Sequence, residues 1–189
     1  MKYTDGKTKL DAARKKITAL REEMREVTKA IEPEVVEDYQ LETTSGPVKL
    51  SSLFGDKDDL IVIHNMGASC PACTMWADGF NGILDHLQAR AAFVVVSPDP
   101  PAAQKKFAGS RGWRFPMASH MGGAFAKDLG YWSERGWRPG VSAFRKQDGK
   151  VVRVSDTGLG PHDDFNSAWH LFDLFPEGHG DWWPKFKYA

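Results

Sequence analysis

Apolar residues recur at alternating steps of three and four along the first 31 residues, and mainly Lys, Arg and Glu fill the positions between them. This heptad spacing predicts an amphipathic helix of about six turns. The helix should end near Pro33, because the residue before a proline avoids helical backbone. Two interpretations stay open: the stripe lies on the surface of its own chain, or it forms the seam of a homodimer. Its members are Leu10, Ala13, Ile17, Leu20, Met24, Val27 and Ile31.

The middle of the chain alternates between short apolar runs and helical patterns. The runs are rich in Val and Ile, which favours buried strands, and two of the shorter ones flank a Ser-Gly-Pro turn. Strand and helix then alternate, which implies a right-handed crossover between parallel central strands. We expect strands at residues 35–43, 48–50, 60–64 and 92–97, a helical turn at 51–55, and helices at 71–90 and 102–110.

The C-terminal third begins with an irregular stretch that contains a short helical piece at residues 123–129. Asp148-Gly149 then separates two β-rich runs, which predicts an antiparallel hairpin. A last helix is expected at residues 163–174, capped by Asp163 or the residues before it, and it should bring Phe165 and Trp169 to the core. The tail at 177–189 is too aromatic to lie in water and should pack on its own domain or on a neighbour.

Length and composition indicate one globular domain: the chain has 189 residues, of which 41% are hydrophobic. We divide it into an N-terminal helix (residues 1–33), a main domain (34–176) and an aromatic tail (177–189). Lys plus Arg balances Asp plus Glu at 25 each, so neither nucleic acid nor an anionic membrane is an expected partner. No apolar run approaches about 18 residues, and we expect a cytoplasmic protein.

Both cysteines of the chain lie in one Cys70-Pro71-Ala72-Cys73 motif, where the strand at 60–64 passes into a helix. Pro71 suits the first helical position, which makes Cys70 the N-cap. The amides of Ala72 and Cys73, together with the helix dipole, should stabilise a Cys70 thiolate. Cys70 is then the predicted nucleophile, and Cys73, one turn on, is placed to resolve a mixed disulfide.

A metal site is not expected at this motif. Tetrahedral zinc needs two further ligands, no second CxxC is present, and the histidines are not at ligand spacing. We therefore predict no metal and no cofactor. In a reducing compartment, a lone cysteine pair of this kind is more typical of redox chemistry than of a structural disulfide.

The parallel half, the hairpin, the final helix and the CxxC position together describe an α/β thioredoxin-like fold. Its central mixed sheet is flanked by helices and extended by an N-terminal helix and a β-hairpin. The chain resembles a bacterial thioredoxin-like family that carries a domain-of-unknown-function label, related to the alkyl hydroperoxide reductase and thiol-specific antioxidant branch. The resemblance lies in Glu37-Asp38-Tyr39, Leu60-Ile61-Val62, His64, Cys70-Pro71-Ala72-Cys73, residues 76–82 and 93–97, Gly112-Trp113, Phe115-Pro116 and Gly140-Val141-Ser142.

The resemblance implies the fold and leaves the reaction open. His64 holds the position at which thioredoxin has a buried carboxylate that handles the proton of its second cysteine. His64 is therefore either the base for Cys73 or a core histidine bonded to the backbone. Pro139 has the offset of thioredoxin's cis-proline, and whether it is cis is left open. Peroxiredoxins need a hydroxyl residue three positions before the reactive cysteine and a proline seven before, where this chain has Gly67 and Ile63.

Several other residues lie near the motif in sequence. Trp76 could shield the cysteines and Asp78 could tune them, whereas a half-buried aromatic ring and a solvated carboxylate are the plainer alternatives. Three tryptophans and two arginines either line a substrate groove or pack within loops, and we favour loop packing. They are Trp113, Trp132, Trp137, Arg135 and Arg138.

The sequence thus predicts a thiol-disulfide oxidoreductase acting on protein or small-molecule disulfides. Cys70 attacks, Cys73 resolves, and Pro71, Trp76, Asp78 and Pro139 shape the site. Two alternatives stay open: a thiol-dependent peroxidase, and a non-enzymatic binding module whose surface responds to the redox state. A homodimer through the N-terminal helix or the aromatic tail is compatible with each of them.

Overall fold

The computed structural model describes residues 1–188, and the chain divides into two compact units. The first unit, Met1–Pro33, consists of the single helix α1 (Tyr3–Ala30), in which no residue is buried. The second unit runs from Glu34 onward and contains the sheet and the other helices. The structure therefore has the N-terminal helix that the heptad spacing predicts.

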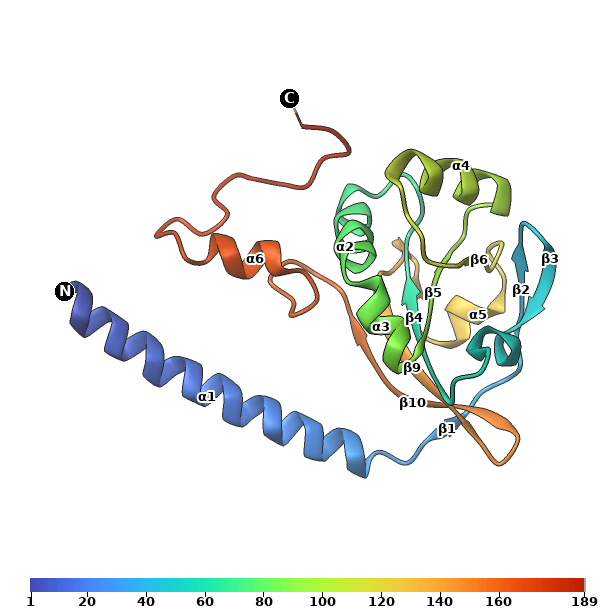
Figure 1. Ribbon diagram of the computed structural model, residues 1–189, viewed down its shortest axis with the longest axis horizontal. Coiled ribbons are helices and arrows are strands. Elements are labelled where there is room, and N and C mark those ends of the chain that lie inside the picture. The colour runs from blue at the N-terminus through green and yellow to red at the C-terminus, as the bar shows by residue number, and fades with distance from the viewer. Residues whose placement is uncertain (189) are drawn as a thin grey trace. The chain divides into compact units, whose positions relative to one another are not determined.

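An eight-stranded mixed sheet forms the centre of the second unit, in the order β1-β10-β9-β4-β5-β6-β2-β3 (Figure 1). Neighbours β4 and β5, and β5 and β6, are parallel, and every other pair is antiparallel. The strands are β1 (Glu34–Val35), β2 (Gln40–Thr43), β3 (Gly46–Lys49), β4 (Asp59–His64), β5 (Ala92–Ser97), β6 (Met117–Ser119), β9 (Gly140–Gln147) and β10 (Lys150–Gly158). The two short strands β7 (Trp132–Ser133) and β8 (Gly136–Trp137) form a separate hairpin.

Helices cover both faces of the sheet, and the alternation of side chains along β4 assigns residues to the two sides. Ile63 packs with α2 and α3 residues in one core cluster, whereas Leu60 and Val62 belong to the other cluster, together with α5. The helices of this unit are α2 (Pro71–Gly82), α3 (Leu84–Arg90), α4 (Pro101–Arg111), α5 (Ala124–Asp128) and α6 (Ser167–Phe172), with a short 3₁₀ helix η1 at Leu50–Phe54.

The predicted architecture is confirmed: the parallel β4–β5 pair and the β9–β10 hairpin, with its turn at Asp148-Gly149, are both present. The single helix expected at residues 71–90 is wrong. It divides into α2 and α3 at Ile83, directly after Gly82, because this region leaves helical geometry (φ −114°, ψ 13°). The short strand β6 was not predicted, since three residues give too little periodicity to detect.

The last helix is also shorter than expected. It spans only Ser167–Phe172, and its cap is Asn166, whose side chain accepts a hydrogen bond from the Ala168 amide, not Asp163. Phe165 therefore lies before the helix and is 40% exposed, whereas Trp169 is fully buried as predicted. The sequence places Asp163 at a plausible cap position, but Asp163 instead accepts hydrogen bonds from the amides of Gly160 and Phe165.

The aromatic tail packs on its own unit, which is one of the two expected outcomes. The Arg111 guanidinium donates a hydrogen bond to the Phe186 carbonyl oxygen over 2.8 Å, and the Phe186 ring lies edge-on to Phe107 of α4. Trp183 reaches the buried Trp169 ring. These contacts connect the tail to both α4 and α6.

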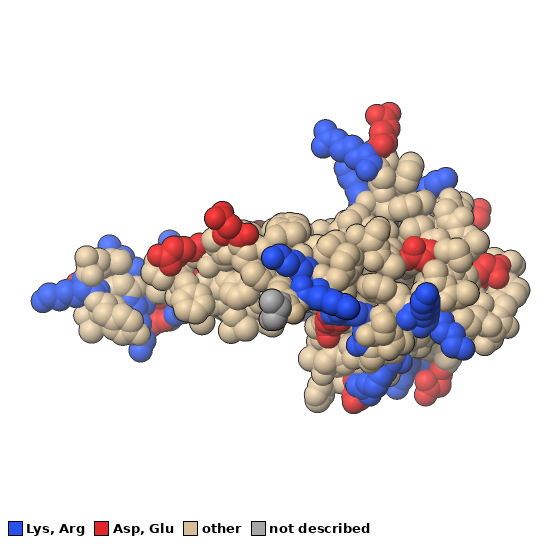
Figure 2. Space-filling model, turned by 90° about the horizontal axis from the view of Figure 1, so that it is seen from above, with Lys and Arg blue, Asp and Glu red and all other residues tan. Residues whose placement is uncertain are grey.

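The surface carries both signs of charge. On the face drawn in Figure 2, basic and acidic side chains are interspersed and form no extended patch of one sign. Within residues 1–188, no helix is long and apolar enough to cross a membrane.

Gly140 tests how tightly β9 packs. A β-carbon here would meet the Tyr131 ring and would lie 2.7 Å from the Thr157 carbonyl oxygen. Tyr131 cannot yield easily, because its ring stacks on His64 and its hydroxyl donates to the Val141 carbonyl oxygen. We therefore expect Gly140→Ala to lower the free energy of unfolding by about 3 kcal/mol in urea titrations.

The matched control is Gly158, which pairs with Gly140 in the β9–β10 register. A β-carbon at Gly158 meets no atom within 4 Å. Gly158→Ala should change the free energy of unfolding by less than about 0.5 kcal/mol. Equal effects of the two substitutions would contradict the steric explanation.

Candidate functional site

Cys70 and Cys73 form a disulfide at the N-terminus of α2, with their Cα atoms 5.3 Å apart. Cys70 is the N-cap, Pro71 occupies the first turn, and the Cys73 amide donates a hydrogen bond to the Cys70 sulfur over 3.0 Å. The predicted cap is thus confirmed for the Cys73 amide. Cys70 is 8% exposed and Cys73 3%, so Cys70 is the more accessible of the pair.

Residues 65–69, between β4 and α2, are held by hydrogen bonds at both ends. The Asn65 amide donates to the Val96 carbonyl oxygen of β5, and the Asn65 side chain accepts from the Gly67 amide. The Cys70 amide then donates to the Gly67 carbonyl oxygen. These hydrogen bonds fix the position of Cys70 relative to the end of β4.

Asp99, two residues after β5, bonds to the same connection, and its role was not predicted from the sequence. Its carboxylate accepts a hydrogen bond from the Ala68 amide over 2.8 Å and one from the Ser97 hydroxyl over 3.3 Å. Gly67 has φ +107°, and a β-carbon there would lie 2.9 Å from an Asp99 carboxylate oxygen. The available signal was an acidic residue two positions after a buried parallel strand, at the end of the sheet where ligands of α/β proteins tend to bind.

His64 has a different environment from the one the sequence suggested. Its Nε2 lies 3.0 Å from the Ser142 hydroxyl, and its ring stacks on Tyr131 with 3.6 Å between centroids. These partners belong to the sheet face opposite α2, because His64 and Val62 point the same way along β4. Among residues 1–188, no hydrogen bond joins His64 to either cysteine.

Burial lowers the pKa of His64 to about 3, helped by the nearby charges of His120 and Arg153. The imidazole is therefore neutral at physiological pH and a weak proton acceptor, because an effective general base needs a pKa near the working pH. Its Nδ1 has no hydrogen-bond partner in the described part of the chain. The role of His64 as base for Cys73 stays a prediction, and this environment argues against it.

His120 directly follows β6, at the same end of the sheet as the carboxyl ends of β4 and β5. Its amide donates to the Ser97 carbonyl oxygen, its Nδ1 accepts from the Gly122 amide, and its ring packs against Trp137 at 4.5 Å. Burial lowers its pKa to about 4. No sequence pattern predicted this position, because β6 is only three residues long.

Trp76 and Asp78 hold α2 in place through contacts away from the sulfurs. Trp76 is buried, and its ring nitrogen donates to Asp163 over 3.3 Å. Asp78 pairs with Arg111 and accepts a 2.7 Å hydrogen bond from the Trp113 ring nitrogen. Asp78 is therefore paired although it is partly exposed, and it connects α2 to α4 and to the segment that follows α4.

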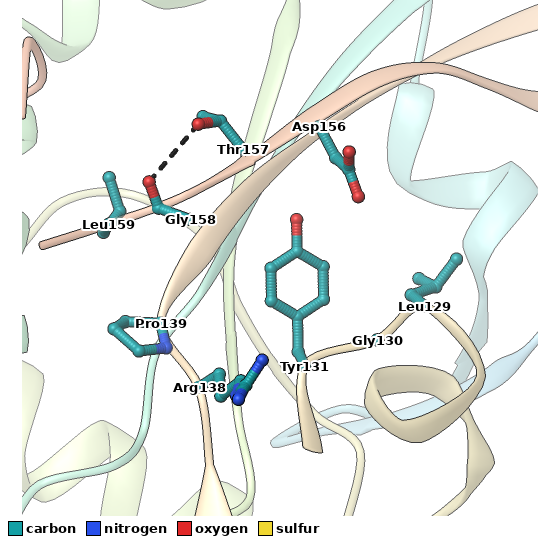
Figure 3. A pocket seen from close by; sticks show the side chains of 9 residues that line it. All are labelled: Leu129, Gly130, Tyr131, Arg138, Pro139, Asp156, Thr157, Gly158 and Leu159. Atoms are coloured by element: carbon teal, nitrogen blue, oxygen red, sulfur yellow. Dashed lines mark hydrogen bonds between the residues drawn. The ribbon is translucent and has the colours of Figure 1, made fainter. Parts of the chain in front are cut away.

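Pro139 directly precedes Gly140, which pairs with His64 at the end of β4. The Asn65–Cys70 connection begins at this same end of β4. No cis peptide bond occurs within residues 1–188, so Pro139 is trans. It lines a pocket of about 420 Å³ whose wall includes the Tyr131 ring between Asp156 and Arg138 (Figure 3). The other lining residues are Leu129, Gly130, Thr157, Gly158 and Leu159.

The tryptophans suggested for a groove are mostly used in packing. Trp113 lies against Phe107 and Phe115, and Trp132 packs on Trp137 across the β7–β8 hairpin. Of the two arginines considered with them, only Arg138 lines the pocket beside Pro139. Among the described residues, no group of three or more His, Cys, Asp or Glu is placed to hold a metal ion.

Comparison with known proteins places this site in context. The model of the family described as "Bacterial protein of unknown function (DUF899)" matches residues 1–188. Two proteins of Mycobacterium tuberculosis, each named "Putative peroxiredoxin", are 31% identical over 99 residues. That match covers 51% of this chain, and the chain spans 64% of the length of these relatives.

Solved structures of the same kind share the fold. Peroxidoxin BcpB from Mycobacterium tuberculosis is 26% identical, with a TM-score of 0.57 over 67% of this chain and 84% of that one. Reduced Prx3 from Vibrio vulnificus is 18% identical, with a TM-score of 0.58 over 76% of this chain and 97% of that one. The thioredoxin-like fold predicted from the sequence is therefore confirmed, in its peroxiredoxin-like form.

Gly67 should be the least replaceable residue of the connection before Cys70. Gly67→Ala adds both the strain of a positive φ and the collision with Asp99, and we expect a loss of about 2 kcal/mol in the free energy of unfolding. In an Asp99→Ala background the further cost of Gly67→Ala should shrink, because only the backbone strain is left.

Gly109→Ala serves as the control, because Gly109 lies within α4 and its added β-carbon would meet no atom within 4 Å. This substitution should stabilise the protein by up to about 1 kcal/mol. If the Gly67→Ala cost were the same with and without Asp99, the carboxylate would not be the residue that limits the space.

The two buried histidines predict how stability depends on pH. Folding lowers the pKa of His64 to about 3 and that of His120 to about 4, whereas histidine in an unfolded chain protonates near 6.5. Between these values the unfolded state binds the additional protons. The free energy of unfolding should therefore be highest above about pH 6.5. Below that pH it should fall by up to about 1.4 kcal/mol per pH unit for each histidine.

Urea titrations between about pH 7 and about pH 4.5 measure this slope. His64→Leu should remove roughly half of it, since one of the two groups is then absent. A slope that the substitution leaves unchanged would show that His64 is protonated in the folded protein.

Proposed function

The chain belongs to the DUF899 family of bacterial proteins of unknown function, and from this premise we propose that it is a thiol-dependent peroxidase. In this proposal Cys70 reduces a hydroperoxide and Cys73 then closes the disulfide. The fold of the chain is peroxiredoxin-like, and two of its relatives are named as peroxiredoxins. Those names describe the relatives, and the peroxidase activity of this chain is the proposal.

The proposed cycle balances with two thiols and an external dithiol. The Cys70 thiolate attacks one peroxide oxygen, the O–O bond breaks, and the leaving alkoxide takes a proton to become an alcohol. Cys70 is thereby oxidised to a sulfenic acid. The Cys73 thiolate attacks that sulfur and releases hydroxide, which becomes water, as the disulfide forms. A dithiol reductant is oxidised to its own disulfide and restores both thiols.

One observation carries the proposal: the Cys70 sulfur caps α2, accepts the Cys73 amide hydrogen bond and is bonded to the Cys73 sulfur. The amide and the helix dipole favour an anionic Cys70 sulfur, which is the reactive form. Because Cys73 lies one turn away, the second step needs no movement of a distant segment. Pro71 supports this by starting the helix immediately after the nucleophile.

Thiol–disulfide exchange is the second candidate, and Gly67 favours it. Gly67 occupies the position three residues before Cys70 at which peroxiredoxins need a hydroxyl side chain. The Asp99 carboxylate leaves no space for even a β-carbon there. The same Cys70 and Cys73 chemistry would then act on a disulfide substrate, with Cys70 forming the mixed disulfide and Cys73 releasing it.

Peroxide consumption by the reduced protein separates the two candidates. A peroxidase should be oxidised by hydrogen peroxide or an organic hydroperoxide roughly 100-fold faster than the same protein unfolded in urea, because the folded site stabilises the transition state. Stopped-flow tryptophan fluorescence and thiol titration give the rate and the stoichiometry. No acceleration by folding would exclude the peroxidase, and catalytic reduction of a model disulfide would then support exchange.

Two variants assign the cysteines. Cys70→Ser should abolish oxidation by peroxide, whereas Cys73→Ser should react once and stop as a sulfenic acid that a dimedone probe labels on Cys70. Retained fast oxidation in Cys70→Ser would reverse the roles proposed for the two sulfurs.

A further inference from the structure

Helix α1 carries an apolar stripe that nothing in its own unit covers. The unit Met1–Pro33 consists of this helix, and no α1 residue is buried. The larger side chains of the stripe within α1 are 47% to 65% exposed, which is unusual for apolar residues that recur on one face of a helix. Most of the stability of helices in proteins comes from the packing of an amphipathic face, so a partner for the stripe would also stabilise the helix.

The spacing assigns heptad positions to the stripe. Leu10, Ile17 and Met24 take position a, and Ala13, Leu20 and Val27 take position d of a two-stranded coiled coil. The flanking g and e positions, which set the orientation of the two helices, then hold charged residues. The g positions are Lys9, Lys16 and Glu23, and the e positions are Arg14, Arg21 and Thr28.

A parallel pair of these helices would be repulsive along both edges. In a parallel pair each g residue faces the e residue of the next heptad on the other helix. Lys9 would then face Arg14 of the second copy, Lys16 would face Arg21, and Glu23 would face the uncharged Thr28. Each charged contact is between like charges, and the symmetry doubles it, which destabilises this arrangement.

An antiparallel pair changes the neighbours. There g faces g and e faces e, and the register that pairs all six stripe residues within α1 sets Leu10 against Val27, Ala13 against Met24 and Ile17 against Leu20 of the second copy. Lys16 then faces Glu23 twice, by symmetry. Arg14 faces Arg21, a like pair that the symmetry also doubles. The ion pair of Arg14 with Asp11 of its own helix, over 2.9 Å, offsets the Arg14 charge in either orientation. The antiparallel pair thus gains the two Lys16–Glu23 contacts that the parallel pair lacks.

We propose that α1 is the dimerisation element of this protein and that it pairs antiparallel with α1 of a second copy. The apolar layers provide the stability, and the Lys16–Glu23 contacts choose the orientation. This interface is separate from the cysteine site and does not depend on the reaction proposed for it.

Charge reversal at Lys16 in the full chain tests both parts of the proposal. Lys16→Glu places like charges opposite Glu23 in the antiparallel pair and should weaken the dimer roughly tenfold in sedimentation equilibrium. Glu23→Lys should weaken it similarly, and the double variant should return to the original dissociation constant. Lys15→Glu is the control: it makes the same change of net charge on the outer face of the helix and should have little effect.

Two other outcomes would contradict the proposal. In a parallel dimer, Lys16→Glu would face Arg21 and would tighten association, which would overturn the antiparallel arrangement. A monomer at all concentrations, or a dimer that Leu20→Asp leaves intact, would overturn the role of α1.

A spin label gives a second readout of orientation. With Thr4→Cys labelled in a Cys70→Ser/Cys73→Ser chain, the two labels should be about 40 Å apart in the antiparallel dimer, given 1.5 Å of rise per residue. Separation of about 10 Å, the ordinary distance between packed helices, would indicate the parallel pair instead.

Discussion

The hydrogen bond from the Cys73 amide to the Cys70 sulfur is the contact on which the proposed chemistry depends. It requires that α2 begin directly after Cys70, which Pro71 promotes, and that the preceding connection leave β4 at a fixed angle. Two hydrogen bonds hold that connection: Asp99 accepts one from the Ala68 amide, and Asn65 accepts one from the Gly67 amide. A sulfur is thereby held where backbone dipoles favour its negative charge.

The sheet separates this thiol chemistry from the buried polar residues on its other face. Cys73 lies in α2, whereas His64, Ser142 and Tyr131 form a stacked and hydrogen-bonded group, and Tyr131 belongs to the core cluster of Leu60 and Val62. A neutral imidazole in such a group contributes packing and hydrogen bonds to the fold. In the proposed reaction, solvent could reach the Cys70 sulfur directly, since Cys70 is 8% exposed.

The sequence was sufficient for the parts of this structure that depend on local patterns. The buried runs at β4 and β5, the CxxC cap and the Asp148-Gly149 turn all carry their signal within a few residues, and each formed as expected. Contacts between distant segments carried no such signal. The side chain of His64 points away from Cys73 because of strand alternation across a sheet whose faces the sequence did not assign, and Asp99 reaches Ala68 from 31 residues away.

Gly67 and Asp99 lie close together before Cys70, because a β-carbon on Gly67 would be 2.9 Å from an Asp99 carboxylate oxygen. The Asp99 carboxylate accepts the Ala68 amide and occupies the space that a β-carbon on Gly67 would need. A carboxylate bonded to the segment before Cys70 opposes a negative charge on the proposed thiolate, while the α2 amides favour one. The proposed reactivity of Cys70 therefore depends on the balance between these two fields, and the fold alone does not determine it.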